Sequence, residues 1–486
     1  MNSQKRVHPT PDSQHLTPEK LMKRLLTLLI VMLAVASGSA PARAADGALK
    51  LPPFKKVKLP NGLTVMLMEQ HEVPIISFNF VIRAGAVADP AGKEGLAALT
   101  AGLLRKGTRS RSADQIAAEL DFIGGTLNTS ASYDYSNGSA EFVKKDINKG
   151  LDLFGDVLLN ATFPQDEVAK QLKQRADAIK AAKDEPQAVI GNYFSAYLYG
   201  NHPYARPVNG DERTLATITR DDVVKFYQTY YTAPNAILAV VGDFNTAEMQ
   251  QALTDKLSAW GGKATATASV PEPQPFAGKK LLLINKPDAT QTFYQIGNVG
   301  ISRTNPDRVY IQVINTLFGG RFTSMLNSAL RIQSGLTYGA RSTFSQLRAA
   351  GPFAISTFTP NESTEKAIDM TLDVLRRLHD KGITEEELKS AKSYMKGQFP
   401  PTIETSDQLA ALLAQLEFYG LDESDVNNYY AKIDSMTMQD AERVIKQYFP
   451  ADNLVFVLIG KAGDIQGVVK KYATQFDTRS INQPGF

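Results

Sequence analysis

The sequence predicts an α+β protein made of two homologous, α/β-sandwich-like domains, each a mixed, largely antiparallel sheet packed with helices. The chain has 486 residues, which is more than one hydrophobic core usually organises. Hydrophobic residues make up 43% of the chain and charged residues 21%, as in packed globular proteins. Both halves combine alternating apolar strands with longer helical patterns, and the same run of elements recurs near the end of each half.

The N-terminal segment 1–44 has the three parts of a signal peptide. Residues 20–24 hold three basic residues, residues 25–36 are apolar, and Ala42-Arg43-Ala44 supplies the small residues that signal peptidase requires. We predict cleavage after Ala44 and a periplasmic location. The apolar run is too short to span a bilayer comfortably, and no other stretch approaches the roughly 18 apolar residues of a membrane helix. We therefore expect no membrane-spanning segment in the mature chain.

A stretch rich in Pro, Ala, Thr and Gly divides the rest of the chain. This segment, 261–278, reads GGKATATASVPEPQPFAG and is typical of an interdomain linker. The predicted domains are therefore residues 45–260 and residues 279–486.

The first half opens with a hairpin pattern at residues 57–67, where Asn61-Gly62 can supply the positive φ of a tight turn. A strand is expected to follow at residues 75–83.

Both halves end with the same helix and strand, offset by 218 residues. Thr219 with Asp222, and Thr437 with Asp440, each approximate a capping box that starts a helix. Apolar strands follow at residues 236–242 and 454–460. An unbroken offset of this kind favours a duplicated fold.

Residues 95–108 read GLAALTAGLLRKGT. This segment resembles the zinc helix of the inverted-zincin, or pitrilysin/insulinase-type, metallopeptidases, whose pattern is roughly G-L-A-H-x-x-E-H-x-L-x-K-G-T. In that family both histidines bind zinc, the glutamate between them activates water, and a later glutamate completes the metal site. The resemblance extends over nearly the whole mature chain and implies a clamshell of two similar domains.

The positions that bind metal in the family are changed in this chain. Ala98 stands at the first histidine, Ala101 at the glutamate and Gly102 at the second histidine. The later glutamate should fall near residues 177–178, yet no Glu occurs between Glu167 and Glu185. Alanines alone are typical of any packed helix, but the flanking matches favour a vacated zinc site. We expect no metal or other cofactor in this chain.

A second motif of the family is retained. Residues 318–339 read FGGRFTSMLNSALRIQSGLTYG and resemble the segment in which an Arg and a Tyr, separated by six residues, face the zinc across a chamber. Arg331 and Tyr338 have this spacing. A guanidinium and a phenol are hydrogen-bond donors suited to peptide carbonyls or a tetrahedral oxyanion. Gly319-Gly320 would allow a tight turn into the helix, and Gly335 would end it.

Charge and composition exclude other classes. The net charge is +3, but removing residues 1–44 takes away six Lys/Arg and two Asp/Glu and leaves about −1, so no electrostatic footprint for nucleic acid is expected. The chain contains no cysteine, which excludes disulfides and thiolate chemistry. No Gly-x-Ser-x-Gly turn or phosphate-binding glycine loop supports another hydrolase.

Some members of the family work as heterodimers in which one subunit carries the zinc helix and the other contributes the Arg/Tyr pair. The resemblance therefore implies a non-catalytic, substrate-positioning subunit of a periplasmic zinc endopeptidase, with peptide substrates and with zinc held by a homologous partner subunit. The alternative is a catalytically silent scaffold or peptide-binding protein of the same fold. Retention of Arg331 and Tyr338 favours the enzyme subunit.

Overall fold

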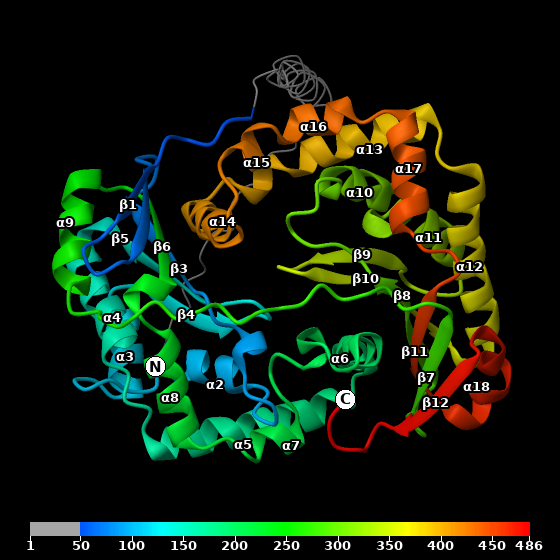
Figure 1. Cartoon of the computed structure of the whole chain (residues 1–486), viewed down its shortest axis with the longest axis horizontal. Helices are drawn as coiled ribbons and strands as arrows, with labels where there is room; N and C mark the ends of the chain where they lie inside the picture. The colour runs from blue at the N-terminus through cyan, green and yellow to red at the C-terminus, as the bar shows by residue number, and fades with distance from the viewer. Residues whose placement is uncertain (1–48) are drawn as a thin grey trace, which may run out of the picture. The chain divides into compact units, whose positions relative to one another are not determined.

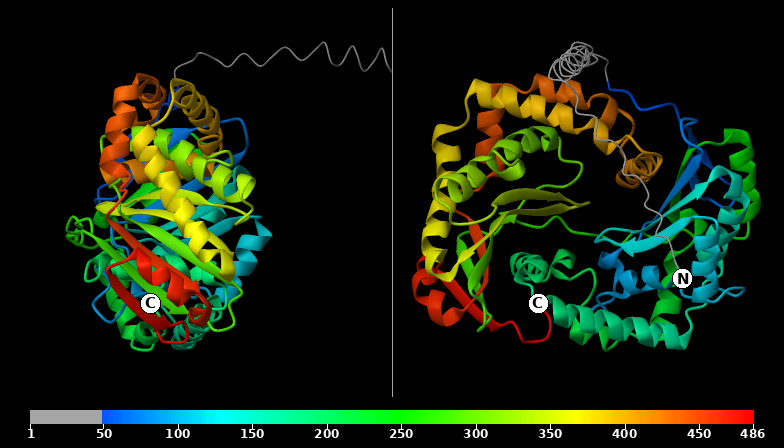
Figure 2. Two further views of the ribbon diagram at one scale, coloured as in Figure 1. Left: turned by 90° about the vertical axis from the view of Figure 1, so that its right-hand side faces the viewer. Right: turned by 180° about the vertical axis from the view of Figure 1, so that it is seen from behind.

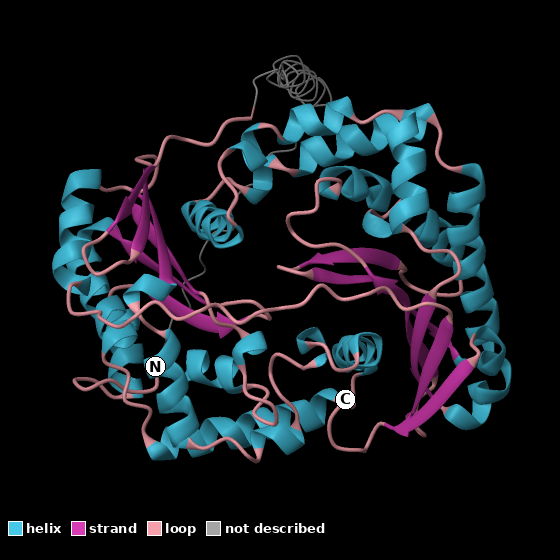
Figure 3. Cartoon of the chain, viewed as in Figure 1, coloured by secondary structure: helices cyan, strands magenta, loops and turns pink. Residues whose placement is uncertain are grey.

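A computed structural model describes residues 49–486, and they contain two six-stranded sheets packed with helices (Figure 1, Figure 3). The first sheet has the order β1-β2-β6-β3-β5-β4 and the second has the order β12-β7-β11-β8-β10-β9. The strands of the first sheet are β1 (Lys55–Lys58), β2 (Thr64–Glu69), β3 (Ile75–Ile82), β4 (Thr126–Ala131), β5 (Ser136–Val143) and β6 (Ala236–Gly242). Those of the second are β7 (Lys279–Asn285), β8 (Gln291–Val299), β9 (Arg341–Gln346), β10 (Ala350–Pro360), β11 (Leu454–Gly460) and β12 (Gln475–Ser480).

The two sheets share one plan, which confirms the predicted fold class. In the first sheet only β2 and β6 are parallel, and the other pairs are antiparallel. In the second sheet β11 and β12 are both parallel to β7, and the other pairs are antiparallel. The strands β2 to β6 therefore occupy the same places in the first sheet as β7 to β11 do in the second. The remaining edge strand is the first strand of the first half, β1, and the last strand of the second half, β12.

Helices cover both sheets. In the first half they are α2 (Leu96–Leu103), α3 (Ala113–Phe122), α4 (Ile147–Leu159), α5 (Gln165–Ala182), α6 (Pro186–Tyr199), α7 (Glu212–Leu215), α8 (Arg220–Tyr230) and α9 (Thr246–Leu257). In the second half they are α10 (Arg308–Asn315), α11 (Met325–Asn327), α12 (Thr364–Lys381), α13 (Glu385–Gln398), α14 (Ser406–Tyr419), α15 (Ser424–Asn427), α16 (Tyr429–Ser435), α17 (Met438–Tyr448) and α18 (Ala462–Val469).

The local predictions of hairpin, strand and caps are confirmed. β1 and β2 pair antiparallel with Val57 opposite Val65, and Gly62 in the turn has a φ of 93°. Thr219 and Thr437 each accept a hydrogen bond from the backbone N–H three residues later and complete capping boxes with the aspartates there. These elements form because the required turn and cap chemistry lies within a few residues.

Each half of the chain places one helix on the sheet of the other half. α14 packs against β3 and β6 of the first sheet, where Leu413 and Ala410 join an apolar cluster with Met68 and Val241. α6 packs against β8 and β11 of the second sheet. Figure 1 and the right-hand view of Figure 2 show α6 beside the second sheet. One face of each sheet is thus buried only because the other half is present.

The segment 261–278 contains no helix or strand and joins α9 to β7. Both of its ends contact the rest of the chain: the Lys263 carbonyl accepts from the Thr232 hydroxyl at 3.0 Å, and the Phe276 N–H donates to the side chain of Asn298 at 2.9 Å. The predicted signal peptide 1–44 lies outside the described residues. Within residues 49–486, every helix is too short or too polar to cross a membrane.

Candidate functional site

α2 begins at a close approach of two backbones. Gly95 precedes the helix with a φ of 100°, and a Cβ at this position would lie 2.9 Å from the Asn209 carbonyl oxygen. The Asp89 carboxylate accepts the N–H groups of Gly95 and Ala97 at 2.9 and 2.8 Å. Burial raises the pKa of Asp89 to about 7, against the lowering effect of these two hydrogen bonds. The start of the helix is therefore fixed by packing and does not depend on a metal.

The three vacated positions lie along α2 and contain no metal ligand. Ala98 and Ala101 are buried, with exposed fractions of 4% and 1%, and Gly102 is half-buried. Among residues 49–486 no group of three or more His, Asp or Glu could hold a metal ion. The side chains at these positions do not fit zinc, since none carries a nitrogen, oxygen or sulfur atom to donate.

Arg175 of α5 fills the space beside these positions. Its Nη2 donates to the Ala98 carbonyl at 2.9 Å, and a Cβ on Gly102 would lie 2.6 Å from the same nitrogen. Its Nε is buried and has no hydrogen-bond partner, and burial lowers the pKa of Arg175 without any charged group acting on it. A guanidinium therefore occupies the place beside α2 and would repel a divalent cation.

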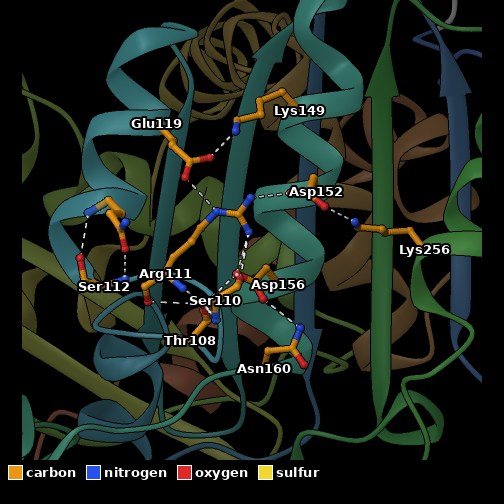
Figure 4. A network of polar contacts seen from close by, with 11 residues as sticks. Thr108, Ser110, Arg111, Ser112, Glu119, Lys149, Asp152, Asp156, Asn160 and Lys256 are labelled. Carbon is orange, nitrogen blue, oxygen red and sulfur yellow. Dashed lines mark hydrogen bonds and ion pairs between the residues drawn. The ribbon is translucent and has the colours of Figure 1, made fainter.

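The retained residues after α2 have structural roles. Gly107 has a φ of 145°, and the Thr108 hydroxyl donates to Asp156 of α4 at 2.7 Å. Arg111 also pairs with Asp156, at 2.8 Å, and with Asp152, at 2.6 Å, as Figure 4 shows. The pattern after the zinc helix is thus kept because it ties the loop to α4.

Arg331 lies on a helical turn of the second half, and Tyr338 lies in the loop that follows it. Ser328–Gln333 is wound as a wide, π-type turn after α11, and Gly335 with a φ of 62° ends it, as predicted. The Leu336 N–H donates to the Leu330 carbonyl at 2.9 Å, which closes the turn.

Packing also explains the glycines before this turn. A Cβ at Gly319 would lie 2.4 Å from the backbone nitrogen of Ser342, so Gly319 allows the chain to lie against β9. The helix after it begins separately, at Ser324, whose hydroxyl accepts the N–H of Asn327. The two glycines therefore lie at the end of the preceding helix. The prediction that they allow the turn into the next helix is wrong.

Both side chains line the same cavity of about 470 Å³. The Arg331 guanidinium carbon lies 4.7 Å from the ring centroid of Phe322, and Tyr338 is 80% exposed. Residues of β8, β10 and α6 complete the wall, and no residue of α2 is among the lining residues. The structure therefore brings the predicted pair together, with polar atoms open to a ligand, in a cavity that does not include the vacated helix.

Comparison with known proteins identifies the family of the chain. Residues 64–212 match the sequence profile described as insulinase (peptidase family M16), and residues 217–395 match the profile described as peptidase M16 inactive domain. The chain belongs to the M16 metallopeptidase family. The M16 fold accounts for the two similar sheets and for the recurrence of elements along the chain.

Similar M16 chains come from several bacteria. A crystal structure of a peptidase M16 inactive domain from Pseudomonas fluorescens is 26% identical, with a TM-score of 0.79 over 84% of this chain and 98% of that one. A Helicobacter pylori protease structure has the same TM-score at 23% identity, covers 84% of this chain and 100% of its own, and shows the fold alone. An uncharacterized zinc protease of Rickettsia bellii is 27% identical over 71% of this chain and 82% of its own length.

Proposed function

We propose that this chain is the non-catalytic, substrate-positioning subunit of a periplasmic heterodimeric zinc endopeptidase. One contrast carries the proposal: Ala98, Gly102 and Arg175 fill the metal position, whereas Arg331 and Tyr338 remain open to a cavity. A chain that had lost all peptidase function would have no reason to keep both donors exposed to a cavity.

Several observations support the individual parts of this proposal. The relatives from Rickettsia bellii and Bacillus subtilis are named zinc proteases, and the second covers 85% of this chain and 99% of its own length at 24% identity. A partner of the same family would supply the zinc. The features of residues 1–44 support export to the periplasm.

The chemistry expected of this chain is hydrogen-bond donation. The partner's zinc would polarise the scissile carbonyl or activate water. Arg331 would hold a peptide carbonyl with its fixed N–H groups, and the Tyr338 hydroxyl would donate to the oxygen on which negative charge develops.

The test is co-expression with a homologous subunit that has an intact H-x-x-E-H helix. Peptide cleavage should require both chains, and zinc should copurify in one equivalent with the partner. Tyr338→Phe and Arg331→Ala should each lower kcat by roughly 10²-fold, as expected for removal of one oxyanion donor. Arg377→Ala is the matched control, because Arg377 is exposed on α12 and lies outside the cavity lining.

Two outcomes would contradict the proposal. Cleavage that is unchanged in both Arg331→Ala and Tyr338→Phe would leave the scaffold function. Cleavage and stoichiometric zinc in the purified chain without any partner would show that catalysis belongs to this chain.

A further inference from the structure

The cavity that contains Arg331 and Tyr338 is strongly basic. Arg321, Arg331 and Arg341 all line it, and no Asp or Glu is among its lining residues. Three positive charges that share one cavity repel each other unless an anion joins them. The absence of a carboxylate from the wall therefore points to one supplied by a ligand.

The half-buried arginines elsewhere in the described chain make either an ion pair or a hydrogen bond to a backbone carbonyl. Arg308, for example, pairs with Asp425 at 2.5 Å, and Arg175 donates to the Ala98 carbonyl at 2.9 Å. The cavity arginines form no ion pair within residues 49–486. Arg321 only donates to the Ser390 hydroxyl at 3.0 Å and lies over the Tyr394 ring, and its Nε is buried without a partner. None of the three donates to a backbone carbonyl of the described residues either, and this lack of both kinds of contact sets the cavity arginines apart.

Arg341 places the third charge at the edge of a sheet. It is the exposed first residue of β9, which pairs with β10 on one side and with no described strand on the other. On that side the Ser342 carbonyl already accepts a hydrogen bond from the Asn315 side chain at 3.0 Å, so a peptide would meet this end of β9 at the Arg341 side chain. A peptide lying there would bring its side chains to the guanidinium groups.

Exposed aromatic rings flank the same charges. Phe322 and Tyr338 are 60% and 80% exposed, and Tyr394 is 40% exposed. All three line the cavity. Apolar rings beside unpaired cations suit a peptide segment that combines an aromatic or large apolar residue with an acidic one.

We propose that this cavity selects peptides with acidic side chains. In this proposal Arg321 and Arg341 bind the carboxylate of the peptide, and Arg331 binds a carbonyl of the peptide backbone. The proposal deepens the proposed function by naming its substrate class, and its binding measurement needs neither partner nor zinc. A bidentate arginine–carboxylate contact would add direction as well as charge to the recognition.

The experiment compares two peptides by calorimetry on the purified chain. Both are acetylated, amidated hexapeptides with one Phe, and two Glu in the first are replaced by two Gln in the second. The acidic peptide should bind at least about tenfold more tightly, and added salt should weaken its binding much more than that of the neutral peptide. Equal affinity of the two peptides would overturn the proposal.

Variants of the cavity arginines test which residues produce the preference for the acidic peptide. Arg341→Gln and Arg321→Gln should each remove most of the preference for Glu over Gln, Arg341→Lys should retain part of it, and Arg377→Gln should leave it unchanged. Arg341 is exposed on an edge strand, so its variant should fold, which circular dichroism checks. A preference that survives both Gln variants would contradict the assignment. So would a preference seen only in peptides with a free C-terminal carboxylate, because the terminus and not the side chain would then be bound.

This result can be separated from the proposed function. Loss of the acidic preference together with partner-dependent cleavage would refute only the substrate class. Retained preference without any cleavage in the presence of the partner would refute only the subunit role and leave a peptide-binding protein.

Discussion

At the scale of single residues, the family pattern survives where it supports the fold and disappears where it served only the metal. Gly95 and Thr108 are retained because a backbone approach and a hydrogen bond to Asp156 depend on them. Neither kind of contact requires the residue types at Ala98 and Gly102, and the Arg175 guanidinium of α5 lies beside both positions. α2 therefore lacks metal ligands at these positions and also has a positive charge beside them.

Restoring the ligands alone should not restore the metal. The variant Ala98→His/Ala101→Glu/Gly102→His should bind no zinc after dialysis, because the Gly102 Cβ would lie 2.6 Å from Arg175 and the cation would face its charge. Adding Arg175→Glu removes both obstacles and supplies a carboxylate, so the fourfold variant should bind about one zinc per chain. Metal content by mass spectrometry checks this, and one equivalent of zinc in the threefold variant would contradict the role of Arg175.

At the scale of elements, a charge network centred on the buried Asp156 holds the loop after α2. The Arg111 guanidinium joins this loop to Asp156 and Asp152 of α4, and Lys256 of α9 also contacts Asp152 (Figure 4). Asp156 is 7% exposed and additionally accepts from Thr108 and Ser110. Removing one member of such a network leaves a buried charge without its partner, so its members stabilise the fold jointly.

This network predicts a loss of stability in acid. Burial alone would raise the pKa of Asp156, but hydrogen bonds from Thr108, Arg111 and Ser110 outweigh it and lower the pKa to about 2. Because the folded-state pKa lies below the unfolded value of 3.8, the contribution of Asp156 is complete above about pH 5 and is lost as the pH falls toward 2.

Urea unfolding at several pH values measures the effect. Between pH 5 and pH 2 the parent chain should lose about 2 kcal/mol more than Asp156→Asn, which has no carboxylate to titrate there. Asp373→Asn, at an exposed site on α12, should follow the parent chain. Parallel curves for the parent and Asp156→Asn would rule out the assigned pKa.

At the scale of the whole molecule, the two halves are joined more by exchanged helices than by the segment between them. α14 buries one face of the first sheet and α6 buries one face of the second. Tyr204 of the first half adds a polar contact, since its hydroxyl donates to Asp134 at 2.8 Å while Asp134 accepts the Arg348 N–H of the second half at 2.8 Å. One face of each sheet would be exposed without the helix from the other half.

Cutting the segment 261–278 should therefore not separate the halves. A specific protease site inserted between Ala266 and Thr267, which are both exposed, should be cleaved without dissociation. The two fragments should elute together from a size-exclusion column, because each buries an apolar helix on the other. Leu413→Ala, which removes a fully buried contact of α14 with the first sheet, should weaken the association by about 2 to 5 kcal/mol. Separate elution of the unsubstituted fragments would contradict the role of α6 and α14 in holding the two halves together.

The sequence alone determined features that depend on neighbouring residues. Thr219 and Thr437 cap their helices, Gly62 turns the hairpin and Gly335 ends the turn after Arg331, because each requires only backbone groups a few positions away. The loss of metal ligands at Ala98, Ala101 and Gly102 could likewise be identified from residue type alone.

Only the tertiary structure decided which distant residues meet. Arg175 contacts a carbonyl 77 positions earlier, and the arginines at 321, 331 and 341 come from a loop, a helical turn and a strand that share one cavity. The exchange of α6 and α14 also left no local signal, since an apolar helix face is compatible with either sheet. Contacts of this kind depend on how whole elements pack. Hydrophobic patterning determines that a face is buried, but it does not determine which element covers that face.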